Sequence, residues 1–302
     1  MRNTIFKFFL LILIINFSVN SCKDSTTPSN KFTQTPINQQ TVEPNIGNNL
    51  IVISTDLNIG ENRFVFAIID NDQNPISIPN IRINLTNSNQ TTTAYNATFE
   101  EWPSGKTGVY VSHPYFDISG PWNIKTTISP NNITLNTTFI VTIESKTPKI
   151  GEPAPKSNNK TRFSHPNLNE ITSDVEPDLA LYTFTIKESV ENSSPILLTF
   201  STPGFCQTAT CGPQVKIISD LSAKYKNTVN FIHVEIYENP TELKGDISNA
   251  KIVQAVKDWN LPSEPWIFLV DQEGVIKSRF EGLATYQEIE IALIENNFLI
   301  SK

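Results

Sequence analysis

The sequence predicts an α/β domain in the C-terminal part of the chain and an all-β sandwich in front of it. Two observations lead to this prediction. Residues 176–302 alternate apolar runs of strand length with segments of helical periodicity, whereas residues 48–146 contain strand-like runs separated only by turn residues. With 302 residues the chain has room for two domains, each with a core of its own.

The composition fits a globular protein and argues against one class of partner. Hydrophobic residues make up 38% and aromatic residues 10% of the chain, which is typical of a sequence that buries a core. The net charge of −7 is spread along the chain without a basic patch, so nucleic acid is not an expected partner.

Residues 1–21 are predicted to be an export signal. Arg2 and Lys7 precede a short apolar run at residues 8–15, and small or polar residues follow it. The sequence Val19-Asn-Ser-Cys22 resembles a bacterial lipobox, which implies cleavage before Cys22, acylation of its thiol and a lipid anchor in the cell membrane. The resemblance places the protein on the extracytoplasmic face, in the periplasm or at the cell surface; an ordinary cleaved signal is the alternative.

Two segments are predicted to be connectors. Residues 22–47 are rich in Ser, Thr, Pro, Asn and Gln with few large apolar side chains, so we expect a flexible tether. Residues 147–175 contain Pro148, Pro153 and Pro155, and this proline density predicts a partly extended linker.

Residues 48–146 are predicted to form an antiparallel β-sandwich of immunoglobulin-like type. This part has no cysteine, so no disulfide joins its sheets, and we assign it no chemistry beyond a role as spacer or partner-docking module. The strand-like runs are 50–54, 63–69, 81–85, 108–112, 122–128 and 138–143.

Residues 176–302 contain elements in the order β-α-β-α-β-β-α. The last helix is expected to begin at Thr285, with Glu288 three residues later as a capping box. The expected strands are 195–200, 229–236, 266–270 and 275–280, and the expected helices follow Gly212, span 252–259 and follow Thr285.

Two cysteines, Cys206 and Cys211, lie between the first strand and the first helix of this part. A thiol at a helix N-terminus is stabilised as thiolate by the helix dipole and the free N–H groups, which suits a redox-active residue. Because the chain is predicted to be exported, the pair is expected to oxidise unless an electron donor keeps it reduced.

The C-terminal part, about residues 176–302, resembles the thioredoxin superfamily. Besides the order of elements, the resemblance depends on the acidic E-N-P turn that ends Val234–Pro240, the segment Leu261–Val270 and the C-G-P sequence Cys211–Pro213. The whole layout also resembles bacterial lipoproteins in which a β-sandwich precedes a thioredoxin-like domain with an F-C-Q-T-x-x-C-G-P loop. These resemblances imply thiol–disulfide exchange, a cis-proline at Pro265 facing the active site, and a site shaped by Phe205, Gly212, Pro213, Pro265 and Trp266.

The cysteine spacing, C-x4-C, departs from the family's C-x-x-C and limits where the helix can begin. Residues five apart in an α-helix have Cα atoms roughly 8–9 Å apart, whereas a disulfide tolerates at most about 7 Å. Both cysteines therefore cannot lie in the helix if they pair. Pro213 favours a helix start near Gly212, which would put Cys211 at the N-terminal end and Cys206 in the preceding loop.

Two assignments of the cysteines remain open at this point. By position after the strand, Cys206 is the attacking thiol and Cys211 the resolving one. By the C-G-P match, Cys211 takes the attacking position and Gln214 stands where thioredoxins have their second cysteine. Helix-terminus electrostatics favour a lowered pKa at Cys211, whereas family layout and loop exposure favour Cys206 as the attacking thiol.

The buried acid of thioredoxins has no carboxylate counterpart here, because Thr199 stands near its position. A proton relay could instead use His233 or Glu235, which share one face of the next strand, or water. The alternative is that His233 and Glu235 are structural polar residues.

The sequence therefore predicts a membrane-anchored thiol–disulfide oxidoreductase. Its expected partners are client proteins with thiols or disulfides and an unidentified redox partner, and no cofactor and no metal site are expected. A scaffold lipoprotein with a structural disulfide is the first alternative, supported by the unusual spacing. Cu(I) handling and a peroxidase reaction are further alternatives, although the Cys and His spacings fit neither family well.

Overall fold

The computed structural model describes residues 48–299 apart from 104, 106, 131 and 207–209. The predicted export signal at 1–21, the lipidation site Cys22 and the tether at 22–47 lie outside the described residues. Within the described ranges, every helix is too short or too polar to cross a bilayer.

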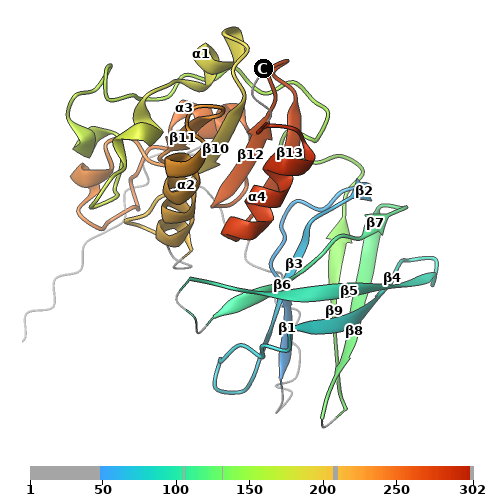
Figure 1. Ribbon diagram of the computed structural model, residues 1–302. Helices are drawn as coiled ribbons and strands as arrows, with labels where there is room; N and C mark the ends of the chain where they lie inside the picture. The colour runs from blue at the N-terminus through green and yellow to red at the C-terminus, as the bar shows by residue number, and fades with distance from the viewer. Residues whose placement is uncertain (1–47, 104, 106, 131, 207–209, 300–302) are drawn as a thin grey trace, which may run out of the picture. The chain divides into compact units, whose positions relative to one another are not determined.

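The first half of the described chain is β-rich and antiparallel (Figure 1). Seven strands form one sheet in the order β1-β3-β6-β5-β4-β8-β9, and β2 (Gly60–Glu61) pairs with β7 (Tyr115–Phe116) in a separate ribbon. The seven strands are β1 (Asn49–Val52), β3 (Phe64–Ile69), β4 (Asn80–Thr86), β5 (Thr92–Glu101), β6 (Gly108–Ser112), β8 (Gly120–Ile128) and β9 (Ile133–Val141).

The hydrogen-bond pattern agrees only loosely with the predicted sandwich of two sheets. The ladder is continuous from β1 to β9, and these two edge strands also contact each other, so a single curved sheet surrounds the core. Alternation along the strands supplies that core, as Ile83 and Leu85 of β4 and Ile124 of β8 are fully buried. Phe64 and Phe116 add aromatic contacts inside the sheet, with ring centroids 6.2 Å apart.

All six predicted runs of this part contain strands, but the longest strand was missed. β5 spans Thr92–Glu101 and consists mainly of Thr, Ala, Asn and Glu, with Ala97 as its one fully buried residue. Tyr95, Ala97 and Phe99 alternate along β5 and contact the core, but half of the strand is exposed and most of its residues are polar, so its apolar signal is weaker than that of the six predicted runs. Pairing with β4 and β6 on either side decides its conformation.

The second half contains a four-stranded sheet in the order β11-β10-β12-β13. β10 (Ile196–Phe200) runs parallel to β11 (Asn230–Val234) and antiparallel to β12 (Trp266–Val270), which pairs in turn with β13 (Ile276–Glu281). The helices are α1 (Ile186–Glu191), α2 (Cys211–Tyr225), α3 (Gln254–Asp258) and α4 (Tyr286–Glu295), visible around the sheet in Figure 1. The predicted order β-α-β-α-β-β-α is confirmed for β10 through α4.

The two faces of this sheet are covered differently. Leu197 and Ile267 belong to one core cluster with apolar residues of α2 and α4, including Ile218 and Leu293. On the other face the core is aromatic: Trp259 lies 4.6 Å from Phe268 and 5.4 Å from Phe200, measured between ring centroids. Every residue of β10 and β12 is buried, as expected for central strands covered on both sides.

The start of α4 confirms half of the predicted capping box. Thr285 is the N-cap and its side chain accepts the Glu288 N–H. In a full capping box the Glu288 carboxylate would also accept the Thr285 N–H. Here both carboxylate oxygens instead accept from Arg63, at 2.6 and 2.9 Å. The Glu288 carboxylate, which the local sequence pattern assigns to the helix cap, therefore binds Arg63, a residue distant in the sequence.

The predicted linker at 147–175 is extended along part of its length and is bonded to the α/β part. Gly151 and Ala154 donate their N–H groups to the carbonyls of Ile276 and Gly274, next to β13. Further along, Ile171 is buried in the same core cluster as α2 and α4. This segment therefore contributes to the C-terminal core.

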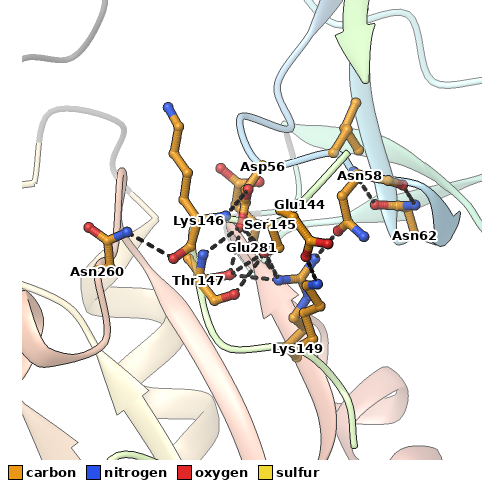
Figure 2. Close-up of polar contacts among 12 residues, drawn as sticks. Asp56, Asn58, Asn62, Glu144, Ser145, Lys146, Thr147, Lys149, Asn260 and Glu281 are labelled. Carbon is orange, nitrogen blue, oxygen red and sulfur yellow. Dashed lines mark hydrogen bonds and ion pairs between the residues drawn. The ribbon is translucent and has the colours of Figure 1, made fainter. Parts of the chain in front are cut away.

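Side-chain contacts also join the β-rich part to the α/β part. Arg279 of β13 donates to the hydroxyls of Ser145 and Thr147, both at 2.6 Å, and to Asn58 at 2.9 Å. Figure 2 shows Asp56 beside Ser145 and Thr147; its carboxylate accepts their hydroxyls and the Thr147 N–H. Burial raises and these hydrogen bonds lower the pKa of Asp56, with a net lowering.

Candidate functional site

The site is centred on a disulfide between Cys206 and Cys211. Their Cα atoms are 5.8 Å apart, within the range of a normal disulfide. Cys211 is the first residue of α2, and Cys206 lies in the loop that follows β10. The expected placement, with one cysteine at the helix start and the other ahead of it, is confirmed.

The two sulfur atoms have different surroundings. Cys211 is 0% exposed, whereas Cys206 is partly exposed. The backbone N–H of Cys211 donates toward Cys206 Sγ at 3.2 Å, so the N-terminal end of α2 directs a free N–H group at the more exposed sulfur. Such a group stabilises negative charge on the sulfur that it faces.

The first turn of α2 is partly open at Gly212 and Pro213 and closed at Gln214. A Cβ atom added at Gly212 would meet nothing within 4 Å. Gln214 is fully buried, and its Oε1 accepts the N–H of Ala284 at 2.8 Å. Gln214, the residue that the C-G-P match places at a cysteine position, thus ties α2 to the loop before α4.

The other predicted site-shaping residues lie in two different environments. Phe205 is partly exposed next to Cys206, and its ring lies 6.3 Å from that of Tyr237. Pro265 is buried and follows a cis peptide bond, as the resemblance implied. Trp266 is 2% exposed and stacks on Phe268, so it belongs to the core.

His233, predicted as a relay candidate, is buried within a local network. Its Nδ1 lies 2.8 Å from the Tyr182 hydroxyl, and its Nε2 lies 3.0 Å from the carbonyl oxygen of Ser201. Burial is the main cause that lowers the pKa of His233. Both ring nitrogens therefore have partners other than the cysteines.

Glu235, the second relay candidate, is linked to the cysteine loop through one intermediary. Its Oε2 accepts from the N–H and the hydroxyl of Ser173, at 2.8 and 2.7 Å. The Ser173 hydroxyl oxygen in turn accepts the N–H of Gly204, two residues before Cys206, at 2.8 Å. Glu235 thus contributes to the position of the loop.

Thr199 occupies the middle of β10 and is 0% exposed. Its hydroxyl has no hydrogen-bond partner among the described residues. The position that the resemblance assigns to a buried acid therefore holds an uncharged side chain in the interior of the sheet.

Glu264 was missed by the sequence reasoning, and its carboxylate lies next to the disulfide. Its Oε2 lies 3.6 Å from Cys211 Sγ and accepts the N–H of Thr202 at 2.7 Å. The residue directly precedes cis-Pro265. A carboxylate next to a proline that is expected to face the site was a signal that could have identified it.

A cavity of about 690 Å³ lies beside this site. Residues 158–165 form one wall, and the end of β11 with the residues after it forms another. Glu235 and Tyr237 line it, and these are the residues that contact Ser173 and Phe205 next to the cysteine loop. In the described residues, no group of three or more His, Cys, Asp or Glu side chains is arranged to hold a metal ion.

The comparisons with known proteins give little further identification. No protein-family model matches the chain, and no curated protein matches it. Among solved structures, one match is a Chlorobium tepidum protein provisionally described as a thiol:disulfide interchange protein DsbE, with 13% identity and a TM-score of 0.36. The alignment covers 51% of this chain and all of the other. Because this similarity is weak, the functional argument depends on the disulfide and its surroundings.

Proposed function

We propose that this protein is a thioredoxin-like thiol–disulfide oxidoreductase that cycles between a Cys206–Cys211 disulfide and a dithiol. One observation carries the proposal: the disulfide lies at the N-terminal end of α2 with one sulfur buried and the other partly exposed. Cys211 donates its N–H to the exposed sulfur. A helix terminus that stabilises a thiolate at an accessible position suits a nucleophilic cysteine.

Three further features support the thioredoxin-like assignment of the C-terminal part. The order from β10 to α4 follows the pattern expected from the resemblance, and β10 and β11 are parallel neighbours joined through α2. A cis-proline, Pro265, precedes β12. The lipid anchor at Cys22, the extracytoplasmic location and the immunoglobulin-like type of the β-rich part belong to the same proposal and derive from the sequence.

We assign Cys206 as the attacking thiol and Cys211 as the resolving thiol. In the reduced protein, the Cys206 thiolate attacks a client disulfide, a mixed disulfide forms and one client thiolate leaves. Cys211 then attacks Cys206 Sγ, the mixed disulfide breaks, and the second client thiolate leaves. Two electrons pass from the protein to the client, and the reverse sequence oxidises a client dithiol.

Trapping of the mixed disulfide tests this assignment. The reduced full chain and its Cys206→Ser and Cys211→Ser variants are mixed with oxidised glutathione, quenched with acid and analysed by mass spectrometry. We expect Cys211→Ser to accumulate a glutathione adduct on Cys206, because the resolving thiol is absent. Cys206→Ser should accumulate at least about tenfold less adduct, since the buried Cys211 thiol is less accessible and less ionised.

Two results would contradict the proposal in different ways. Accumulation on Cys211 in the Cys206→Ser variant would reverse the roles of the two cysteines. A wild-type disulfide that resists reduction and forms no adduct would favour a structural disulfide, the function supported by the complete burial of Cys211.

A further inference from the structure

We propose that Glu264 is the catalytic base and acid for Cys211: its carboxylate takes the Cys211 thiol proton when that sulfur attacks the mixed disulfide, and returns it in the reverse step. The inference rests on the proposed function and adds to it a residue to which the resemblance assigns no role. It concerns the resolving half of the cycle only.

The position of the Glu264 carboxylate fits this role. Its Oε2 lies 3.6 Å from Cys211 Sγ, a distance at which a thiol S–H can donate to an oxygen. The same oxygen accepts the N–H of Thr202 at 2.7 Å, which holds it in place beside the sulfur. The two residues in contact are 53 positions apart in the sequence, so tertiary structure brings them together.

Cys211 needs a local base because its own surroundings disfavour the thiolate. The residue is 0% exposed, and burial raises the pKa of a thiol. The N–H group of Cys211 at the helix terminus is directed at Cys206 Sγ. Thr199, at the position where the resemblance expects an acid, is a neutral hydroxyl. Glu264 is the carboxylate in contact with this sulfur.

The electrostatics of Glu264 suit proton exchange with a thiol. The pKa of Glu264 is raised to about 8: burial is the main cause, the Thr202 N–H opposes the shift, and the nearby Glu235 carboxylate adds to it. Among the described residues, the titratable groups that interact with Glu264 are Cys211, Glu235 and Tyr237. An ordinary cysteine thiol has a pKa of about 8.5, and burial raises the pKa of a thiol further, so a carboxylate whose pKa is about 8 is closer in proton affinity to a buried thiol than an ordinary glutamate is, which favours acid–base catalysis.

The resolving step breaks one S–H bond and one S–S bond, and it forms one O–H bond and one S–S bond. The Cys211 S–H bond breaks and its proton goes to a Glu264 carboxylate oxygen, while the Cys211 sulfur forms a bond to Cys206 Sγ. The bond between Cys206 Sγ and the client sulfur breaks, and the client leaves as a thiolate. The protonated Glu264 then releases its proton to that thiolate or to solvent, which regenerates the carboxylate.

The resolving step can be measured separately from the first step. Reduced wild type and Glu264→Gln are mixed with oxidised glutathione, quenched at intervals, and analysed for the glutathione adduct and for the intramolecular disulfide. We expect adduct formation to agree within about twofold, while Glu264→Gln slows adduct resolution at pH 7 by at least about tenfold. Gln can still accept the Thr202 N–H, so the variant removes the base and keeps the hydrogen bond.

The pH dependence provides a readout that a purely structural role would not change. In wild type the resolution rate should rise with pH through a midpoint near 8, as Glu264 ionises. Glu264→Gln should lose that midpoint. Glu235→Gln should move it to lower pH, because the neighbouring negative charge that opposes ionisation of Glu264 is removed.

Glu238→Gln is the matched control, since Glu238 is an exposed carboxylate that lines the neighbouring cavity. It should leave the resolution rate and its pH midpoint unchanged. Equal resolution rates and equal pH profiles in wild type and Glu264→Gln would overturn the role of Glu264 while leaving the oxidoreductase intact. Reduced wild type that forms neither the adduct nor the intramolecular disulfide would instead overturn the proposed function and this inference with it.

Discussion

At the scale of single residues, exposure distinguishes the two cysteines more clearly than their order in the sequence does. Cys206 is partly exposed and receives an N–H from the helix start, whereas Cys211 is fully buried against Glu264. The sequence left two assignments of the attacking thiol open, because the position after the strand favours Cys206 whereas the C-G-P match favours Cys211. Burial supplies an independent criterion that favours Cys206 as the attacking thiol.

The raised pKa of Glu264 also leads to a prediction about the pH dependence of stability. Its pKa in the folded protein, about 8, lies above the ordinary value of a glutamate, so the folded state binds the proton more tightly than the unfolded state does. The stabilisation is fully present below the ordinary glutamate pKa and is lost as the pH rises through about 8. We expect Glu264→Gln to remove on the order of 2 kcal/mol of this pH dependence, allowing for partial solvation of the side chain.

Urea unfolding at a series of pH values measures this effect. Between pH 5 and 8.5 the free energy of unfolding of wild type should fall relative to that of Glu264→Gln. Parallel curves for the two proteins would show that Glu264 ionises with an ordinary pKa.

At the scale of elements, the start of α4 is stabilised by one local hydrogen bond and by one contact with a distant residue. Thr285 caps the helix through the Glu288 N–H, while the Glu288 carboxylate binds Arg63.

Thr285→Ala should lower the free energy of unfolding by about 1 kcal/mol, because the helix loses its side-chain cap. Thr285→Ser, which keeps the hydroxyl, should stay within about 0.5 kcal/mol of wild type. Denaturant titration of both variants checks the prediction; equal losses would mean that the methyl group matters rather than the cap.

Two segments differ from what the sequence predicted. β5 has alternating apolar residues at Tyr95, Ala97 and Phe99, but its other residues are polar and half of the strand is exposed, so pairing with β4 and β6 decides its conformation. The segment 147–175 has the proline content of a connector, yet Ile171 joins the core and Gly151 bonds to Ile276. Conversely, β12 was predicted with its observed bounds, because a run buried on both faces is apolar throughout.

At the scale of the described molecule, Arg63 connects the β-rich part to the α/β part through buried polar contacts. Its side chain is 6% exposed, pairs with Glu288 and also donates to the carbonyls of Glu281 and Leu283. Removal of one partner of such a buried group leaves the others without hydrogen bonds.

Arg63→Met should therefore lower the free energy of unfolding by about 3 kcal/mol. Arg63→Lys should recover only part of the loss. Lysine keeps the positive charge, but its ammonium cannot form the two parallel bonds that the guanidinium makes to the Glu288 carboxylate. Denaturant unfolding monitored by tryptophan fluorescence compares the three proteins. A midpoint for Arg63→Met equal to that of wild type would show that this connection contributes nothing to stability.

The order of elements from β10 to α4 and the placement of Cys211 at the start of a helix could be predicted from the sequence alone, because they follow from local patterns: apolar periodicity, proline geometry and the distance limit of a disulfide. The cis-proline at Pro265 was implied by the resemblance of the surrounding segment to the thioredoxin superfamily. The sequence did not show which cysteine is buried, that Glu288 binds Arg63, or that Glu264 lies beside Cys211 Sγ. Each of these depends on side chains distant in the sequence meeting in space, and no local pattern encodes such a distance.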